Sequence, residues 1–331
     1  MEQQIRWGIL GLGRIAGVFA EGLKHVPGST LVACGSRGPQ KAEEFGAKWS
    51  VPRRHASYAA LAADPEVDAI YIATPHPLHR ENCLLCLEHG KAVLCEKPFA
   101  VNAAEAAEVL AAARRHNLLL MEAMWSRFLP HLVQVRDLIA GGAIGEPRLL
   151  QADFAFRAGW NPDGRLLNPQ LAGGGLLDVG VYNVNLAHMV FGVPQRVMGT
   201  AHLGETGVDE QAGMLLQFAA GRLAVLSCGV RTSTPQEAFI AGTEGRIRIH
   251  TPWWRPSRLT VSIPGKGDTE YAPAIVGNGY NYEALEFGRC LRAGLTESPV
   301  MPWAESLAVM QTLDALRAQF GLAYPMERRA A

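Results

Sequence analysis

A glycine-rich turn near the start of the sequence constrains the fold more than any other feature. The apolar segment 6–10 runs directly into Gly11-Leu12-Gly13-Arg14-Ile15-Ala16, and an amphipathic helical pattern then covers residues 14–24. In such a strand–turn–helix the first glycine permits a tight turn, the second lets the backbone approach a pyrophosphate, and the alanine allows close helix–sheet packing. The pattern therefore predicts a dinucleotide site at the helix N-terminus. The residues expected there are Gly11, Gly13, Arg14 and Ile15.

The same alternation of apolar runs and amphipathic stretches continues to about residue 122, which is typical of a parallel sheet. Strands are expected at 6–10, 30–35, 69–73, 92–95 and 118–121, and helices at 14–24, 39–47, 78–89 and 102–116. Residues 1–122 are thus expected to form an α/β Rossmann domain with a parallel sheet.

The character of the sequence changes after residue 122. Consecutive strand patterns separated by glycine and turn residues favour an antiparallel sheet. Strands are expected at 148–156, 212–218, 222–229 and 246–249, and helices at 131–140, 176–190, 281–293 and 303–320. We predict that residues 123–331 form an α+β domain with a large open, mostly antiparallel sheet, which binds the substrate. The uncovered face of that sheet predicts a homodimer formed through it.

Composition argues against several classes of protein. The 31 Lys and Arg residues balance 31 Asp and Glu residues, so nothing favours a nucleic-acid partner. No apolar run approaches the roughly 20 residues of a membrane span, and the first strand begins too early for a signal peptide, so we expect a cytoplasmic protein without membrane contact.

Of the six cysteines only Cys83 and Cys86 are closely spaced, and both lie in the middle of an expected helix. Neither a metal site nor a disulfide is therefore expected.

The end of the second expected strand indicates which dinucleotide binds. NAD-type sites usually place an acidic residue there for the ribose 2′-hydroxyl. This chain instead has Gly35-Ser36-Arg37, with Lys41 on the next helix. Ser36 can donate a hydrogen bond to a phosphate, and Arg37 can pair with it while stacking on adenine. The sequence favours NADP, although Arg37 as a plain exposed loop residue is the alternative.

Three segments carry side chains suited to proton transfer. Lys97 follows the strand at 92–95, Thr74, His76 and His79 follow the strand at 69–73, and a glycine-rich loop at 173–175 precedes Asp178 and Tyr182. A tyrosine, with an ordinary pKa near 10, is a poor base unless a neighbouring ammonium favours the phenolate. Lys97 and Tyr182 would form such a pair, with Asp178 orienting the lysine or a substrate hydroxyl. Each residue alone has a structural alternative. Lys97 could be a solvated loop end, Asp178 a helix N-terminal carboxylate, and Tyr182 a core ring.

Together these motifs resemble the glucose-fructose oxidoreductase/inositol dehydrogenase (Gfo/Idh/MocA) family over essentially the whole chain. The resemblance rests on the turn 11–16, on Ala73-Thr74-Pro75 with His79, on Cys95-Glu96-Lys97-Pro98 and on 173–182. Segments 92–98, 121–128 and 178–182 are most similar to the branch of dimeric dihydrodiol dehydrogenases, which also act as NADP-dependent D-xylose dehydrogenases.

The resemblance implies roles for particular residues. Lys97 and Tyr182 would carry catalysis, and the Lys97–Pro98 bond would be cis. The residues expected near the cofactor from the later strands are Thr74, His76, His79 and Glu96. A helix-start histidine such as His79 is equally often only a cap. Tyr182 stands where many relatives have histidine, and His76 where many have asparagine.

The substrate pocket is expected between the two domains. Its candidate residues are Trp125, Arg127, Phe154 and Trp160. Aromatic faces suit sugar rings and cyclic diols alike, and such residues are as often core or interface. The favoured function is NADP-dependent hydride transfer with a sugar or cyclic diol of D-xylose or trans-dihydrodiol type. The alternatives are bound cofactor used as a redox relay, a sugar or ketone reductase, and a non-catalytic NADP sensor.

Overall fold

The structure is a computed structural model that describes residues 4–327, and it divides into two compact units. The first comprises residues up to 128 together with 275–307, and the second comprises 129–274 together with the residues from 308. The segment 275–307 thus packs with the first unit although it is distant in sequence. Helix α8 (Tyr280–Arg292) explains this, because its Phe287 ring lies 4.9 Å from the ring of Trp7.

The first unit is built on a six-stranded sheet with the order β3-β2-β1-β4-β5-β6, and every pairing is parallel. Its strands are β1 (Ile5–Leu10), β2 (Ser29–Gly35), β3 (Arg53–His55), β4 (Ala69–Ile72), β5 (Ala92–Glu96) and β6 (Leu120–Ala123). All residues of β4, β5 and β6 are buried, as expected of strands covered on both faces. The predicted Rossmann-type parallel sheet is confirmed.

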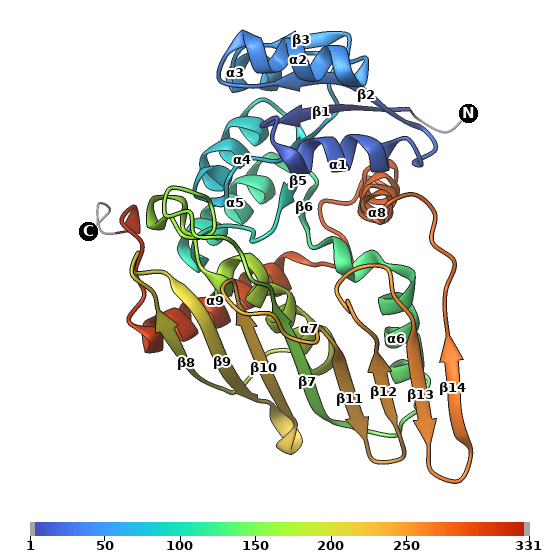
Figure 1. Ribbon diagram of the computed structural model, residues 1–331. Helices are drawn as coiled ribbons and strands as arrows, with labels where there is room; N and C mark the ends of the chain where they lie inside the picture. Colours follow the sequence, from blue (N-terminus) through green and yellow to red (C-terminus); the bar gives the residue numbers. More distant parts are fainter. Residues whose placement is uncertain (1–3, 328–331) are drawn as a thin grey trace. The chain divides into compact units, whose positions relative to one another are not determined.

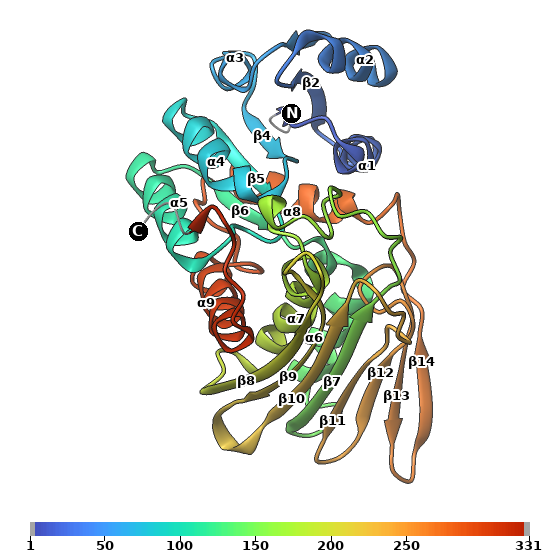
Figure 2. The same cartoon turned by 60° about the vertical axis from the view of Figure 1, so that its left-hand side comes forward.

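Helices cover both faces of this sheet. Figures 1 and 2 show α4 and α5 side by side on one face and α1 and α8 on the other. The helices of this unit besides α8 are α1 (Arg14–Leu23), α2 (Pro39–Trp49), α3 (Tyr58–Ala62), α4 (His79–Glu88) and α5 (Ala103–His116), with short 3-10 turns at His76–Leu78 and Trp125–Phe128. The sequence pattern did not predict β3 or α3, because three and five residues are too few to show a periodicity.

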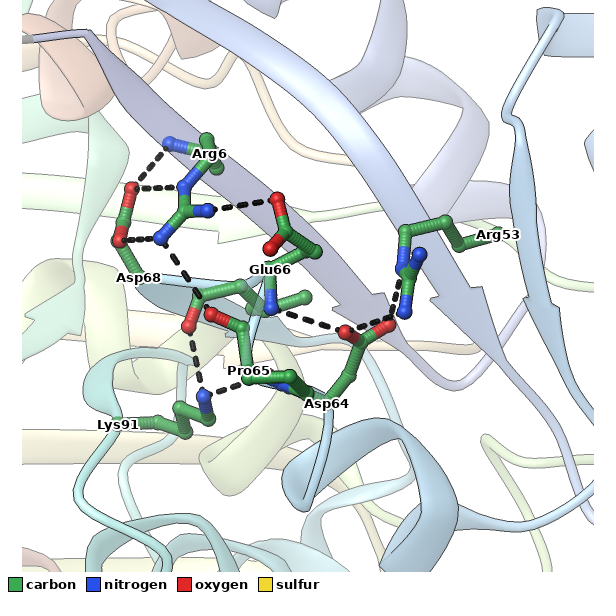
Figure 3. Close-up of polar contacts among 8 residues, drawn as sticks. Arg6, Arg53, Asp64, Pro65, Glu66, Asp68 and Lys91 are labelled. Atoms are coloured by element: carbon green, nitrogen blue, oxygen red, sulfur yellow. Dashed lines mark hydrogen bonds and ion pairs between the residues drawn. The ribbon is translucent and has the colours of Figure 1, made fainter.

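A network of charged residues ties together the amino ends of the strands (Figure 3). The guanidinium of Arg6 pairs with Asp68 at 2.7 Å, and Arg53 Nη2 donates to Asp64 Oδ1 at 2.8 Å. The ammonium of Lys91 donates to the backbone carbonyl of Asp64 at 2.6 Å. These contacts fix the end of the sheet opposite to the glycine turn, which follows the carboxyl end of β1.

The second unit is built on an eight-stranded sheet with the order β14-β13-β12-β11-β7-β10-β9-β8. Its strands are β7 (Pro147–Ala155), β8 (Arg196–Leu203), β9 (Asp209–Gln217), β10 (Leu223–Gly229), β11 (Ala238–Gly242), β12 (Arg246–Ile249), β13 (Leu259–Ile263) and β14 (Gly267–Tyr271). Only β7 and β10 pair in parallel; the other neighbours are antiparallel. This confirms the predicted large, mostly antiparallel sheet.

Helices α6 (Pro130–Ala140), α7 (Val181–Phe191) and the part of α9 (Trp303–Phe320) that belongs to this unit lie on one face of the sheet (Figure 2). The burial pattern follows this arrangement. On β10, Ala224 and Leu226 are buried, whereas Leu223 and Val225 are 36% and 43% exposed. One face of the sheet is therefore open within a single chain. Among the described helices, none is long and apolar enough to cross a membrane.

Candidate active site

The glycine turn has the geometry of a phosphate cradle. Gly11 adopts a φ of +90°, and a Cβ there would lie 2.7 Å from Thr74 Cγ2, so only glycine fits. A Cβ at Gly13 would meet no described atom within 4 Å, which leaves the backbone open to a ligand. Helix α1 begins at Arg14 with neither a side-chain cap nor an acidic residue in its first turn. Its N-terminal amides and dipole therefore suit a pyrophosphate.

A surface groove of about 720 Å³ begins at this turn, lined by Gly13 and Arg14 and by residues of α1 and α2 that include Lys41. At the end of β2, the buried Ser36 hydroxyl donates to the carbonyl of Gly38 at 2.7 Å. Arg37 is exposed, and its guanidinium lies beside the phenol of Tyr58. Burial raises the pKa of Tyr58, and the charge of Arg37 reduces that rise only in part. An exposed guanidinium placed here is available to an anionic group.

His79 holds two turns of the first unit together. Its Nδ1 lies 2.9 Å from the carbonyl of Pro98, and its Nε2 lies 2.9 Å from that of Thr74. Burial lowers the pKa of His79 to about 4, so the ring is neutral at neutral pH and donates to one of the two carbonyls. Asn82 Nδ2 donates to Thr74 Oγ1 at 3.2 Å, and His76 is 5% exposed. His79 thus links the turn after β4 to the turn after β5.

Lys97 follows β5 directly, and the Lys97–Pro98 peptide bond is cis, as the resemblance implied. Glu96, the last residue of β5, is 6% exposed. Its Oε1 accepts a hydrogen bond from the Tyr71 hydroxyl, and its Oε2 accepts one from the backbone N–H of Lys97 at 3.1 Å. The Glu96 carboxylate is therefore engaged with the protein on both oxygens.

A second carboxyl group lies near Glu96. Glu283 on α8 is wholly buried, and neither of its carboxyl oxygens has a hydrogen-bond partner among residues 4–327. Burial, reinforced by the charge on Glu96, raises the pKa of Glu283 well above its ordinary value. Glu283 is therefore the member of the pair that retains a proton.

In the second unit, the glycine loop 173–175 opens the segment that carries Asp178 and Tyr182. The predicted helix 176–190 begins with a π-helical turn at Leu176–Gly180, and α7 continues from it. This turn packs tightly on β10, since a Cβ at Gly180 would lie 2.9 Å from Cys228 Sγ. Such π turns occur frequently at functional sites. Asp178 forms an ion pair with the half-exposed Arg165.

Tyr182 lies among aromatic rings of the second unit. It is 5% exposed, and its ring centroid lies 5.4 Å from that of Phe154 and 6.0 Å from that of Trp254. Phe154 and Trp254 stack on each other at 4.2 Å, and Trp254 Nε1 donates to Gln236 Oε1 at 3.1 Å. The ring of Tyr182 therefore packs at a tilt against this stacked pair, which fixes the direction of the tyrosine ring.

The other predicted substrate residues have varied surroundings. Trp125 is 4% exposed and stacks on Tyr280 at 4.3 Å. Arg127 is buried, forms an ion pair with Glu305 and donates to the carbonyl of Val300 at 2.8 Å. Trp160 is 49% exposed, and the guanidinium of Arg231 lies 5.5 Å from its ring centroid. Their contact with a substrate remains a prediction.

Each unit therefore gathers part of the predicted site. The first unit brings Gly11, Thr74, His79, Glu96 and Lys97 to the carboxyl ends of β1, β4 and β5. The second unit brings Asp178 and Tyr182 together with Phe154. The described cysteines are all buried and free, and no group of three or more His, Cys, Asp or Glu residues within 4–327 is arranged to hold a metal ion.

Several residues of the site were not singled out from sequence. They are Tyr71, Arg165, Asp209, Gln236 and Glu283. None of them lies in a recognisable motif, and each reaches the site through a contact between distant segments. Trp254, in the turn between β12 and β13, likewise reaches Phe154 from a segment a hundred positions away in the sequence.

Two family models match the chain and between them cover most of it. One, described as an oxidoreductase family with an NAD-binding Rossmann fold, matches residues 5–124. The other, described as the GFO/IDH/MocA C-terminal domain, matches residues 132–248.

Curated and solved relatives match along nearly the whole length. The chain is 40% identical to trans-1,2-dihydrobenzene-1,2-diol dehydrogenase of Mus musculus and 37% identical to that of Homo sapiens, each over 98% of this chain and 99% of the relative. An aldose-aldose oxidoreductase from Caulobacter crescentus, complexed with glycerol, has a TM-score of 0.88 at 25% identity, covering 96% of this chain and 97% of that one. A 3-ketoreductase from Actinomadura kijaniata, in complex with NADP and TDP-benzene, has a TM-score of 0.85 at 27% identity, covering 96% and 98%. Because both of its domain models and its full-length relatives match, the chain belongs to the Gfo/Idh/MocA family of nicotinamide-dependent oxidoreductases.

Proposed function

We propose that this protein is an NADP-dependent dehydrogenase that transfers a hydride between the nicotinamide and a hydroxyl or carbonyl carbon of a sugar or cyclic diol. The similarity to trans-1,2-dihydrobenzene-1,2-diol dehydrogenases, over nearly the full length of both chains, supports a diol-type substrate. The two solved relatives, an aldose-aldose oxidoreductase and a 3-ketoreductase, support carbohydrate-like substrates. Both classes present a secondary alcohol for oxidation.

The residues of the first unit fit a dinucleotide. The open backbone at Gly13 and the uncapped start of α1 would receive its pyrophosphate. The exposed Arg37 guanidinium, with the Ser36 backbone before it, suits a ribose 2′-phosphate better than a 2′-hydroxyl. When bound, the cofactor supplies the hydride acceptor or donor. The presence of NADP in the solved 3-ketoreductase agrees with this choice.

Lys97 and Tyr182 are proposed as the proton-handling pair. In the oxidative direction, the Tyr182 phenolate would take the proton of the substrate hydroxyl while the carbon loses its hydride. In the reductive direction, the Tyr182 phenol would return that proton to the carbonyl oxygen. An ammonium beside a phenol favours the phenolate, and this is the role proposed for Lys97. Asp178, already paired with Arg165, would orient a substrate hydroxyl.

The observation that carries the proposal is the setting of Tyr182. It is a buried tyrosine packed against the stacked rings of Phe154 and Trp254, just after a glycine loop and a π-helical turn, in a chain 40% identical to a diol dehydrogenase. Apolar faces beside an acid/base group provide both a dry environment and a surface for a ring-shaped substrate.

The direct test is a set of initial rates of NADPH formation with NADP⁺ and D-xylose, D-glucose, inositol or a cyclic trans-diol, repeated with NAD⁺. Turnover of D-xylose or the diol, with NADP⁺ preferred, is the expected result. No turnover in either direction, despite measurable NADP⁺ binding, would contradict the proposal.

A redox relay is the second candidate, and the high structural similarity to an aldose-aldose oxidoreductase favours it. In that case the cofactor would stay bound, and one substrate would be oxidised while another is reduced. Cofactor that copurifies with the protein, together with product formation but no net NADPH, would identify this activity. Rapid exchange of the bound cofactor with labelled NADP⁺ during turnover would exclude it.

We also propose a homodimer formed through the open face of the eight-stranded sheet. The exposed apolar residues Leu223 and Val225 on β10 lie on that face and support the proposal. Light scattering on the wild type and on a Val225→Lys variant tests it. A dimeric mass that falls to the monomer in the variant is expected, and a wild-type monomer at micromolar concentration would contradict it.

A further inference from the structure

A buried carboxylate from another strand lies against the glycine loop that precedes Asp178 and Tyr182. We propose that Asp209, the first residue of β9, is a positioning residue: its carboxylate holds the loop 173–175 and thereby sets the place of Asp178 and Tyr182. The inference rests on the proposed function, because Asp209 would act on the reaction only through those two residues.

The main contact is a hydrogen bond to the first residue of the π-helical turn. Asp209 is wholly buried, and its Oδ2 accepts the backbone N–H of Leu176 at 2.6 Å. No side chain within the segment 173–180 itself caps this turn. The carboxylate of β9 therefore satisfies an N-terminal amide that a local Ser, Thr, Asn or Asp residue would otherwise serve.

The loop is also shaped to the carboxylate. Gly174 adopts a φ of +119°, and a Cβ there would lie only 2.0 Å from Asp209 Oδ1. A Cβ at Gly175 would lie 3.4 Å from Asp209 Oδ2. The backbone thus approaches the carboxyl group so closely that glycine is required at residue 174. The segment that the sequence predicted only as a glycine-rich loop is packed against one specific side chain.

Neutral contacts hold the same loop from other sides. The Tyr324 hydroxyl donates to the carbonyl of Gly173 at 2.8 Å, and the N–H of Gly174 donates to the carbonyl of Leu166 at 2.9 Å. Tyr324 keeps its proton at neutral pH, because burial raises the pKa of its phenol. Of these contacts to the loop, Asp209 is therefore the one whose charge changes near neutral pH.

The charged and titratable groups that face Asp209 are Arg317 of α9, Tyr324 and Cys228 of β10. Burial raises the pKa of Asp209 to about 7, against the lowering effect of the Leu176 N–H and of Arg317. Arg317 is itself paired with Asp314 and Glu327, and burial and the charge of Asp209 keep Cys228 a neutral thiol. Protonation of Asp209 would place a hydrogen on a carboxyl oxygen that faces the loop. The neutral carboxyl group would then accept the Leu176 N–H more weakly than the carboxylate does.

The test compares the wild type with Asp209→Asn, which keeps the size of the side chain but cannot change charge. Asp268→Asn, an exposed position on β14 of the same sheet, is the matched control. Rates are measured in the reductive direction, where Tyr182 must be protonated, so that acidification does not slow the reaction through Tyr182. The expected result for wild type and control is a kcat that falls as the pH drops through about 7.

In Asp209→Asn, kcat should be lower by up to about 10²-fold at pH 8, since a small misplacement of reacting groups has an effect of this size. The fall of kcat below about pH 7, which we call the acid limb, should be absent, and NADP⁺ affinity should be unchanged. Its thermal stability above pH 7 should equal or exceed that of wild type, because no buried carboxylate must be ionised. A merely structural role would instead lower stability and leave the pH profile alone.

Tyr324→Phe serves as a second variant, because it removes one loop contact and keeps the carboxyl group. In this variant kcat should fall modestly, and the loss of kcat below about pH 7 should persist because Asp209 is still present. The variant therefore tests the role of the loop contacts even if Asp209→Asn does not fold. An Asp209→Asn enzyme with wild-type kcat and the wild-type acid limb would overturn the inference. Full activity of Tyr182→Phe would instead refute the proposed function, so the two failures are distinguishable.

Discussion

Glu96 and Lys97 are joined by a hydrogen bond from the Lys97 backbone N–H to Glu96 Oε2, at 3.1 Å. The other oxygen of Glu96 accepts the Tyr71 hydroxyl, and the buried Glu283 lies close enough for the charge on Glu96 to raise its pKa. Two carboxyl groups buried together are not both ionised at neutral pH. The pair therefore carries one negative charge, on Glu96, next to the backbone that presents the proposed catalytic lysine.

Glu283→Gln should leave activity close to wild type, because glutamine resembles a protonated glutamate. Stability should change in a defined direction. A carboxyl whose pKa is raised in the folded state binds its proton more tightly there, so wild-type stability falls as the pH rises above about 4.5, by at most about 1.4 kcal/mol per pH unit. In denaturant titrations across pH, the variant should lose the part of this slope that belongs to Glu283. At a pH well above 7, where Asp209 is ionised, a protonated-carboxyl infrared band of unchanged intensity in Glu283→Gln would contradict the assignment.

Lys97→Met should lower kcat by about 10²- to 10⁴-fold, the usual contribution of a positioned proton-transfer group. It should also move the rise of the oxidation rate to higher pH, because the ammonium that favours a phenolate is gone. Fluorescence titration should show NADPH binding retained. Lys91→Met is a poor control, since Lys91 is buried in the ion network, so the exposed Lys266→Met is used instead. An unshifted pH profile would argue that the lysine acts otherwise.

Arg37→Ala should raise the KM for NADP⁺ about 10- to 100-fold, as expected for the loss of a charged hydrogen bond of about 1.5–3 kcal/mol. The KM for NAD⁺ should hardly change, because NAD⁺ has no 2′-phosphate. Arg80→Ala, an exposed pair partner of Glu108, is the matched control. Equal losses with both cofactors would mean that Arg37 does not read the 2′-phosphate.

Asp64→Asn should destabilise the first unit in a pH-dependent way. Hydrogen bonds and the charge of Arg53 hold the pKa of the buried Asp64 well below its ordinary value of 3.8. A depressed carboxyl pKa stabilises the folded state above that value, and the contribution disappears as the pH falls below it. The variant should lose about 2 kcal/mol at neutral pH. The difference should shrink steadily as the pH falls below 3.8, and a constant difference across pH would assign the effect to packing alone.

The repetition of strand and helix patterns allowed most elements of the first unit to be predicted. Buried parallel strands are short apolar runs, and the turn 11–16 identifies the first crossover. The segment 275–307 was not assigned to this unit, because a helix pattern shows an apolar face but not what covers it. The contact of Phe287 with Trp7 joins residues almost three hundred positions apart.

The candidate site was predictable where a motif carries its chemistry, as at Gly11 and Gly13. The roles implied for Lys97 and Tyr182 came from the resemblance to the family. The supporting residues were not predictable, since Glu283 and Asp209 each reach the site from a distant element and have ordinary sequence neighbours. The π-helical turn at Leu176–Gly180 was also missed, because its sequence keeps the apolar pattern of an α-helix.

The most direct test of the proposed mechanism is the turnover of Tyr182→Phe with NADP⁺ and the best substrate of the panel, measured together with NADPH affinity. The phenylalanine keeps the ring packed against Phe154 and Trp254 and removes only the hydroxyl. We predict a loss of about 10²- to 10⁴-fold in kcat with unchanged NADPH affinity. Wild-type turnover in this variant would contradict the role of Tyr182 and with it the proposed mechanism.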